Sequence, residues 1–384
     1  MLLDILSPAR VLFGPGSSYR LGEEARRLGK RALVVTGRRS LTVSGNMQQR
    51  IVTPLRQAGL ESIFFSQVSA EPTVDIVDQA RKLAQEEQCE MVIGVGGGSV
   101  LDVAKATAGL FREEAPTRDY HAGREITTPR LPWIAVPTTA GSGSEVTNNA
   151  VLINPHSSLK ASIRNDAWIA DVAIVDPIFS MVMPKKLTAQ TGLDALTHAI
   201  ESYTSRWANP FSDALSEKAV LLIMQNIYTA YQLGRSREAR EKMMLGSLMA
   251  GITLNQVRVG AVHALSHSIG LKYGLAHGLV CGVLLPYVME FNYPRVVEKY
   301  ANLAYQSGIA SPSLDEKAAA NRLIHYVYRL REKLQIPDKL GTLGLQKTDL
   351  PDLVKAALTS TSLEANPRMA KREDLLEILE KNLV

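Results

Sequence analysis

The stretch "MVIGVGGGSVLDVAKA", residues 91–106, passes from an apolar run through three consecutive glycines into a helical pattern. Such a passage predicts a buried strand, a glycine turn and a covering helix. Similar apolar runs lie elsewhere in the first half of the chain, at "RALVVTG" (31–37), "SIFFSQV" (62–68), "WIAVPTT" (133–139) and "VAIVDP" (172–177). Helical patterns separate several of them, as in "TVDIVDQARKLAQEEQ" (73–88), where Thr73 is placed to cap the helix. The alternation predicts a doubly wound α/β domain whose parallel sheet is covered on both faces.

The second half of the chain has a different pattern. Long segments such as "KLTAQTGLDALTHAIESYTS" (186–205) carry apolar residues at helical spacing, and β-branched runs become scarce after about Met183. We therefore predict two domains, an α/β domain over residues 1–184 and an all-α domain over residues 185–384.

Composition narrows the class of protein. The 384 residues are 46% hydrophobic and 21% charged, which is ordinary for a globular chain, and we expect no membrane partner because no apolar run approaches the roughly 20 residues of a membrane helix. The two cysteines, Cys89 and Cys281, lie outside any CxxC motif and indicate a reducing, cytoplasmic setting. The net charge of +5 is scattered among acidic residues, so we expect no nucleic-acid partner.

The glycine turn of 94–106 is a candidate phosphate site. Gly96, Gly97 and Gly98 would let the backbone approach a ligand and adopt positive φ, while Ser99 and the first helical amides face an anion. The spacing matches neither GxGxxG nor a P-loop, and a plain strand-to-helix turn is the alternative.

A second loop, "VPTTAGSGSEVT" (136–147), also follows an apolar strand. It supplies hydroxyl donors at Thr138, Thr139, Ser142 and Ser144 among flexible glycines. Because open α/β sheets bind ligands at the carboxyl ends of their strands, we expect the two loops to bind a nucleotide together. A hydroxyl-rich surface loop is the alternative.

The end of the first strand of the predicted sheet bears on the choice of cofactor. Here the chain reads Gly37, Arg38, Arg39 and Ser40, with no acidic residue. An acid would bind a ribose 2′-hydroxyl, whereas an arginine accommodates a 2′-phosphate. The pattern therefore favours NADP over NAD, unless both arginines merely face solvent.

Four of the seven histidines lie between positions 198 and 277. Asp194 and His198 stand four residues apart on one predicted helix, as do His263 and His267 on another, which we expect to end at Gly270. His277 then precedes a new helical run. A carboxylate with imidazoles is a ligand set for Zn²⁺ or Fe²⁺, although spacing leaves open which three histidines bind.

The two loops and the four histidines lie in the segments "GGGSVLDVAKA" (96–106), "PTTAGSGSEVT" (137–147), "TGLDALTHAIESY" (191–203) and "GAVHALSHSIGLKYGLAHGLVCGVLLPYV" (260–288). With them the chain resembles the iron-containing, or group III, alcohol dehydrogenases over essentially its whole length. The resemblance implies a fold similar to that of dehydroquinate synthase, in which a Rossmann-like nucleotide-binding domain precedes an all-α metal-binding domain.

The resemblance also implies roles for individual residues. It makes metal ligands of Asp194, His198, His263 and His277, with His267 near the reacting centre but not a ligand. It places the cofactor against Gly97, Gly98, Ser99, Asp102, Thr138, Thr139, Ser142 and, through a short match, Lys160. At Gly37, family members that prefer NAD carry an aspartate, so the resemblance also favours NADP.

The implied activity is reversible hydride transfer between a primary alcohol and NADP(H), with Fe²⁺ or Zn²⁺ polarising the substrate oxygen and His267 relaying a proton. The implied substrates are small alcohols or aldehydes, and the implied assembly is a homodimer or a larger homo-oligomer. The alternatives are an NAD-dependent polyol dehydrogenase of the glycerol or propanediol type, a dehydroquinate-synthase-like lyase, and a non-catalytic, metal-stabilised nucleotide-binding protein.

Overall fold

A computed structural model describes residues 4–38, 47–157 and 159–383. The chain divides into two compact units, Met1–Val182 and Met183–Val384. Each unit has its own core and is described by itself.

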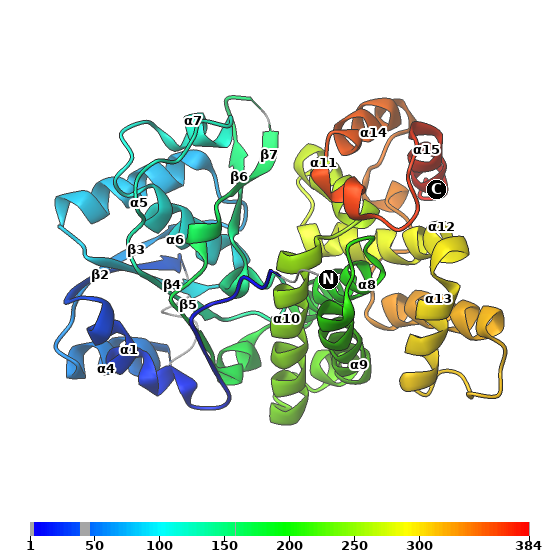
Figure 1. Ribbon diagram of the computed structural model, residues 1–384, viewed down its shortest axis with the longest axis horizontal. Coiled ribbons are helices and arrows are strands. Elements are labelled where there is room, and N and C mark those ends of the chain that lie inside the picture. Colours follow the sequence, from blue (N-terminus) through cyan, green and yellow to red (C-terminus); the bar gives the residue numbers. More distant parts are fainter. Residues whose placement is uncertain (1–3, 39–46, 158, 384) are drawn as a thin grey trace. The chain divides into compact units, whose positions relative to one another are not determined.

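The N-terminal unit is built on a six-stranded sheet in the order β1-β8-β5-β4-β2-β3 (Figure 1). All neighbouring strands in it run parallel. The strands are β1 (Arg10–Phe13), β2 (Arg31–Gly37), β3 (Glu61–Val68), β4 (Met91–Gly96), β5 (Trp133–Pro137) and β8 (Val172–Val175). The predicted parallel α/β fold is thus confirmed, and the apolar runs gave every strand except β1.

Helices cover both faces of this sheet. On β2, Leu33 and Val35 belong to one apolar cluster, which includes residues of α5 (Val74–Glu86) and α6 (Gly98–Leu110). The alternate residues Ala32 and Val34 belong to the other cluster, with α1 (Leu21–Leu28) and α4 (Thr53–Gln57). The centres of strands buried on two sides are nearly continuous apolar runs, which is why the sequence showed them so clearly.

Local signals also hold in this unit, with one omission. The hydroxyl of Thr73 accepts a hydrogen bond from the Ile76 amide at 3.4 Å, as predicted for the cap of α5. The sequence did not reveal an antiparallel hairpin of β6 (Asn149–Asn154) and β7 (Leu159–Arg164), nor the short α7 (Thr117–His121).

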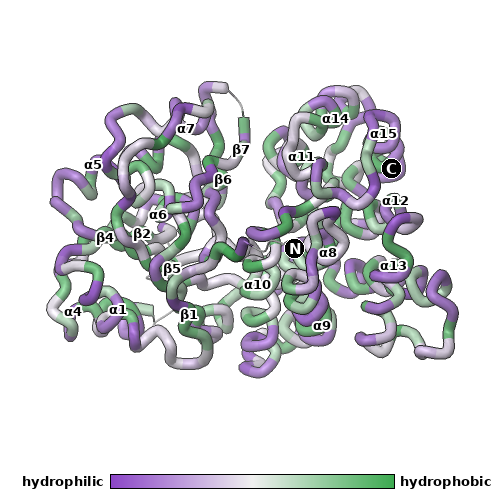
Figure 2. The backbone as a smooth tube through the Cα atoms, in the orientation of Figure 1, coloured by the Kyte–Doolittle hydropathy of each residue, from purple (hydrophilic) through white to green (hydrophobic). Residues whose placement is uncertain are grey.

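The C-terminal unit is helical, and no strand occurs among its described residues, 183–383. Its helices are α8 (Lys185–Thr204), α9 (Pro210–Gln232), α10 (Arg237–Val257), α11 (Ala261–Tyr273), α12 (His277–Gln306), α13 (Glu316–Lys333), α14 (Leu350–Leu358) and α15 (Arg372–Glu380). Hydrophilic and hydrophobic segments alternate along these helices (Figure 2). Helix α8 is the exception, because almost every residue from Thr188 to Thr204 is buried beneath α9, α10 and α12. On a helix buried on all sides, a polar side chain costs free energy unless it forms a hydrogen bond or binds an ion.

The predicted end of α11 at Gly270 is wrong. The helix continues for one more turn to Tyr273, and Gly274 then takes the left-handed conformation, with φ of 62°. The carbonyl of Gly270 accepts the amides of Gly274 and Leu275, which closes the last turn. His277 begins α12, as predicted.

Within the parts of the chain that the structure describes, no helix is both long enough and apolar enough to cross a membrane.

Candidate metal centre and nucleotide site

Three helices of the C-terminal unit each present two polar side chains four residues apart, and therefore on one helical face. The pairs are Asp194 and His198 on α8, His263 and His267 on α11, and His277 and Cys281 on α12. Helix α12 comes close to α8 because glycine stands at the contact. A Cβ at Gly278 would clash with the carbonyl of Gln190, and one at Gly282 would lie 2.7 Å from Leu193.

The carboxylate of Asp194 is the centre of this group. Its Oδ1 atom has three imidazole Nε2 atoms around it, at 3.5 Å in His277, 3.8 Å in His263 and 4.0 Å in His198. The rings of His198 and His263 stack with centroids 4.5 Å apart. The four side chains predicted as metal ligands therefore lie together.

Two atoms of this group have no ordinary partner. Asp194 Oδ1 and His263 Nε2 are buried and make no hydrogen bond to any residue that the structure describes. Asp194 is only 6% exposed and His263 only 3%. Buried polar atoms are almost always satisfied, so a carboxylate oxygen and an imidazole nitrogen left open toward one another need an explanation. A divalent cation satisfies both, and the donors present fit it.

Glu201 orients one of these imidazoles from the other side. It lies on α8, and its carboxylate accepts the Val262 amide at 2.7 Å and contacts His263 Nδ1 at 2.5 Å. Burial by itself lowers the pKa of His263, but the charges of Glu201 and Asp194 outweigh it and the pKa is raised. In the neutral ring, which is the form that binds a metal, a proton on Nδ1 beside Glu201 leaves the lone pair on Nε2, facing Asp194.

The sequence analysis missed both Glu201 and Cys281. Glu201 follows Asp194 by seven residues and therefore shares its helical face, which was the available signal. Cys281 follows His277 by four residues in the same way, and its Sγ lies 3.5 Å from His277 Nε2. Burial and the charge of Asp194 raise the pKa of the Cys281 thiol well above its usual range.

His267 lies at the edge of this group. Its ring centroid is 5.1 Å from that of His277 and 6.4 Å from that of His263. The side chain is half-buried, whereas His263 is buried. An imidazole in this position is close to the donors and still reaches solvent.

In the N-terminal unit the glycine turn differs from the expectation in one respect. Gly97 caps α6 with φ of −76°, and neither it, Gly96 nor Gly98 has positive φ, so that part of the prediction is wrong. The glycines are required because the second loop is close: a Cβ at Gly98 would lie 2.6 Å from the Ser142 hydroxyl, and one at Gly97 would lie 3.2 Å from the Thr139 hydroxyl. The two predicted nucleotide loops are therefore in contact.

Other predicted cofactor residues surround the same turn. The amide of Thr138 donates to the Gly96 carbonyl at 2.9 Å, and the Ser99 hydroxyl donates to the Ala70 carbonyl at 2.6 Å. Lys160, on β7, pairs with Glu71 at 2.7 Å. These contacts join the carboxyl ends of β4 and β5 to the segment after β3.

The end of β2 carries the residues predicted to select NADP. Gly37 is the last residue of the strand and Arg38 is exposed beyond it. Arg39 and Ser40 lie outside the described residues.

Asp102 lies inside the unit beneath the glycine turn. Its two carboxylate oxygens accept the Ser144 hydroxyl at 2.6 Å and the Val151 amide at 3.1 Å. The buried Lys105 donates to the side chains of Ser144 and Thr147, each at 3.1 Å, and to the Asn149 carbonyl at 2.6 Å. Burial lowers the pKa of Lys105 to about 8. This network ties α6 to the loop that follows β5.

Family models of known proteins match both the N-terminal and the C-terminal unit. A family model described as iron-containing alcohol dehydrogenase matches residues 8–177, and one described as the C-terminal part of the Fe-containing alcohol dehydrogenase family matches residues 188–383. The chain is 35% identical to the 1,3-propanediol dehydrogenase of Citrobacter freundii over 98% of both chains. It is 32% identical to the NAD-dependent methanol dehydrogenase of Bacillus methanolicus, over 98% of this chain and 99% of that protein. The chain belongs to the iron-containing alcohol dehydrogenase family.

The fold leads to the same family. The crystal structure of a 1,3-propanediol oxidoreductase superposes with a TM-score of 0.95 at 36% identity, with all of both chains covered. The expected fold and enzyme class are therefore confirmed: this alcohol dehydrogenase is an oxidoreductase that acts on the CH–OH group of small alcohols or on the corresponding aldehydes.

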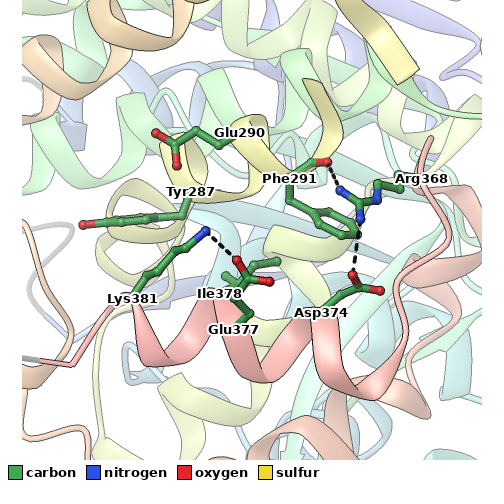
Figure 3. A pocket seen from close by; sticks show the side chains of 8 residues that line it. All are labelled: Tyr287, Glu290, Phe291, Arg368, Asp374, Glu377, Ile378 and Lys381. Atoms are coloured by element: carbon green, nitrogen blue, oxygen red, sulfur yellow. Dashed lines mark hydrogen bonds and ion pairs between the residues drawn. The ribbon is translucent and has the colours of Figure 1, made fainter. Parts of the chain in front are cut away.

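A cavity of about 130 Å³ lies elsewhere in the C-terminal unit of the dehydrogenase, beside α12 and α15 (Figure 3). Four of its charged side chains form two ion pairs, Arg368 with Asp374 at 3.4 Å and Lys381 with Glu377 at 2.8 Å, and Glu290 accepts a hydrogen bond from the Tyr328 hydroxyl at 2.9 Å. None of the residues around Asp194 lines it. We assign this cavity no part in the reaction.

Proposed function

We propose that this chain is an NADP(H)-dependent alcohol dehydrogenase and aldehyde reductase for primary alcohols, with Fe²⁺, or Zn²⁺ in its place, held by Asp194, His198, His263 and His277. The observation that carries the proposal is the convergence of imidazole nitrogens on Asp194 Oδ1, at 3.5 to 4.0 Å, around buried atoms that lack hydrogen-bond partners among the described residues. Three imidazoles with a carboxylate suit both metals, so the choice of iron follows the family.

When bound, the metal supplies Lewis-acid polarisation of the substrate oxygen, and the nicotinamide accepts or donates the hydride. The protein's part is to hold the donors. Glu201 fixes His263 with Nε2 toward Asp194, and the buried surroundings of Asp194 keep water from competing for it. His267 is half-buried beside His277, and an imidazole there can carry the hydroxyl proton between substrate and solvent.

The proposed cofactor site lies on the α/β domain, residues 1–184, and the metal site on the helical domain, residues 185–384. We assign the cofactor to Gly37, Arg38, Arg39, Ser40, Gly96, Gly97, Gly98, Ser99, Asp102, Thr138, Thr139, Ser142 and Lys160. The start of α6 offers free amides to a phosphate, and the absence of an acid after β2 leaves room for a 2′-phosphate. Asp102 contributes indirectly, since its oxygens already accept from Ser144 and Val151 and so hold the loops in place.

A second candidate is a polyol dehydrogenase that uses NAD. It is favoured by the 35% identity to a 1,3-propanediol dehydrogenase over nearly the whole chain. We propose a cytoplasmic homo-oligomer in either case.

The test is metal analysis of protein purified without air, followed by turnover of an alcohol panel with NADP⁺ and with NAD⁺. We expect one divalent ion per chain and a higher kcat/KM with NADP⁺ and a primary alcohol. Better turnover of diols with NAD⁺ would favour the second candidate. Metal without any turnover of alcohols or aldehydes would reject both.

The role of His267 is tested by His267→Ala. We expect slower turnover and a changed pH profile with an unchanged metal content. Unchanged turnover and an unchanged pH profile would remove His267 from the mechanism.

A further inference from the structure

Cys281 faces the same space as the predicted metal ligands. It lies one helical turn after His277 on α12, and its Sγ is 3.5 Å from His277 Nε2. One donor atom from each of Asp194, His263, His277 and Cys281 lies within 4.8 Å of all the others. Ligand atoms bonded to one ion at about 2.0 to 2.3 Å lie within about 4.6 Å of one another, so small side-chain movements bring these four donor atoms onto a single ion.

Two buried atoms near this thiol lack hydrogen-bond partners among the described residues. Asp194 Oδ1 and His263 Nε2 are more than nine-tenths buried and aimed into the same space, without a hydrogen-bond partner among the described residues. Cys281 itself is fully buried, and it forms no disulfide. A small apolar residue would fill this volume equally well. A thiol placed beside two buried polar atoms without partners therefore suggests a chemical role in addition to packing.

We propose that Cys281 is a further donor to the metal of this centre, and that its sulfur shifts the centre's preference from Fe²⁺ toward Zn²⁺ and other thiophilic ions. The inference rests on the proposed function, since it concerns the same metal. The bond that forms joins the sulfur to the ion, the thiol proton leaves to solvent, and no oxidation state changes. Adding a sulfur ligand to a set of oxygen and nitrogen ligands favours zinc over iron. A thiolate also lowers the positive charge with which the metal polarises a substrate oxygen.

The imidazoles surround Asp194 at unequal distances, and the nearest of them also contacts the thiol. His277 is the nearest at 3.5 Å and is the one whose Nε2 also contacts the sulfur. His198 is the farthest at 4.0 Å. The sulfur is therefore added to the four proposed ligands from the α12 side.

The test is the absorption spectrum of the protein loaded with Co²⁺, which reports sulfur ligation directly. We expect a thiolate-to-cobalt charge-transfer band in the near ultraviolet in addition to the visible bands of bound Co²⁺. Cys281→Ser should lose the charge-transfer band and keep the visible bands, and its apparent affinity for Zn²⁺ should fall by about tenfold or more relative to its affinity for Fe²⁺.

Cys89→Ser is the matched control, because Cys89 is the other buried free cysteine and lies in the N-terminal unit. It should retain the charge-transfer band. If Cys281→Ser is poorly folded, Cys281→Ala and the spectrum of the unaltered protein decide the question.

Visible Co²⁺ bands without a charge-transfer band in the unaltered protein would overturn this inference. If that protein still oxidises alcohols, the proposed function stands while the sulfur ligand falls. If no metal binds at all, both fall.

Discussion

Two buried polar clusters in this chain differ in how completely they are satisfied. In the N-terminal unit, both oxygens of Asp102 accept hydrogen bonds, and the ammonium of Lys105 donates three. In the C-terminal unit, Asp194 Oδ1 and His263 Nε2 are as deeply buried but lack hydrogen-bond partners among the described residues. Burial alone therefore does not identify a ligand site. A satisfied cluster stabilises the fold, whereas converging buried atoms without hydrogen-bond partners indicate a cation-binding site.

The largest effect is expected at Asp194. Asp194→Asn should remove the metal and lower alcohol turnover by about a thousandfold or more, because several kcal/mol of transition-state stabilisation are lost. The metal-free variant should melt no lower than the metal-free parent, because a buried carboxylate oxygen without a partner is replaced by a neutral group.

The control for Asp194→Asn is His156→Ala. His156 is an exposed histidine of the N-terminal unit that contacts Asp75 at 3.4 Å. Its replacement should change neither metal content nor turnover. Full metal content in Asp194→Asn would place the metal elsewhere.

At Lys105 we expect a loss of stability without a loss of metal, the reverse of Asp194. Lys105→Met should destabilise the folded protein by about 3 kcal/mol, because it leaves the buried Asp102 and Ser144 without their cation. The metal content should not change. Urea unfolding measures the first effect and metal analysis the second, and an unchanged urea midpoint would show that the network is not structural.

Glu145 adds a pH dependence to the satisfied cluster. It is buried near Lys105, and burial raises its pKa to about 7. The folded state therefore holds a proton that the unfolded state has lost above its ordinary pKa of 4.5. Stability falls as the pH rises from that value to about 7, and Glu145→Gln should remove the loss, which amounts to about 3 kcal/mol.

The measurement is the free energy of unfolding at about pH 5 and about pH 8. The glutamine variant should gain on the parent only at the higher pH, whereas the exposed Glu125→Gln should track the parent at both. A gain of equal size at both values would refute the assignment.

The smallest of these effects is expected at Glu201, which supports the metal centre without binding the metal. Glu201→Gln should weaken metal affinity by about 10- to 100-fold, because an amide cannot accept from both Val262 and His263. Competition with a chelator measures this affinity. Glu238→Gln, an exposed change at the start of α10, is the control, and equal affinities would make Glu201 only a structural residue.

The sequence predicted the parts of the fold that are buried on both sides. The run at residues 31–37 is a strand over the same residues, because its centre from Ala32 to Val35 is apolar and buried. The edge strand Arg10–Phe13 was missed, since only four residues pair and none is fully buried. The end of α11 was placed one turn early, because a glycine inside a helix looks the same in a sequence as one that ends it.

For the site, spacing within one helix was the useful signal. It joined Asp194 to His198 and His263 to His267, and the family resemblance then chose His263 and His277 as ligands and set His267 aside. Cys281 and Glu201 carry the same kind of spacing, four residues after His277 and seven after Asp194, but only the fold shows that Glu201 contacts His263 on another helix and that Cys281 lies beside the predicted ligands. Whether a buried atom such as Asp194 Oδ1 has a partner depends on the tertiary structure and cannot be found from spacing.

The most direct measurement is anomalous diffraction from crystals of the metal-loaded enzyme, collected at the absorption edge of the metal. The account predicts a single peak per chain, bonded to the Asp194 carboxylate and to imidazole nitrogens from α8, α11 and α12. A peak at any other place in the chain, or none in protein that oxidises alcohols, would contradict it.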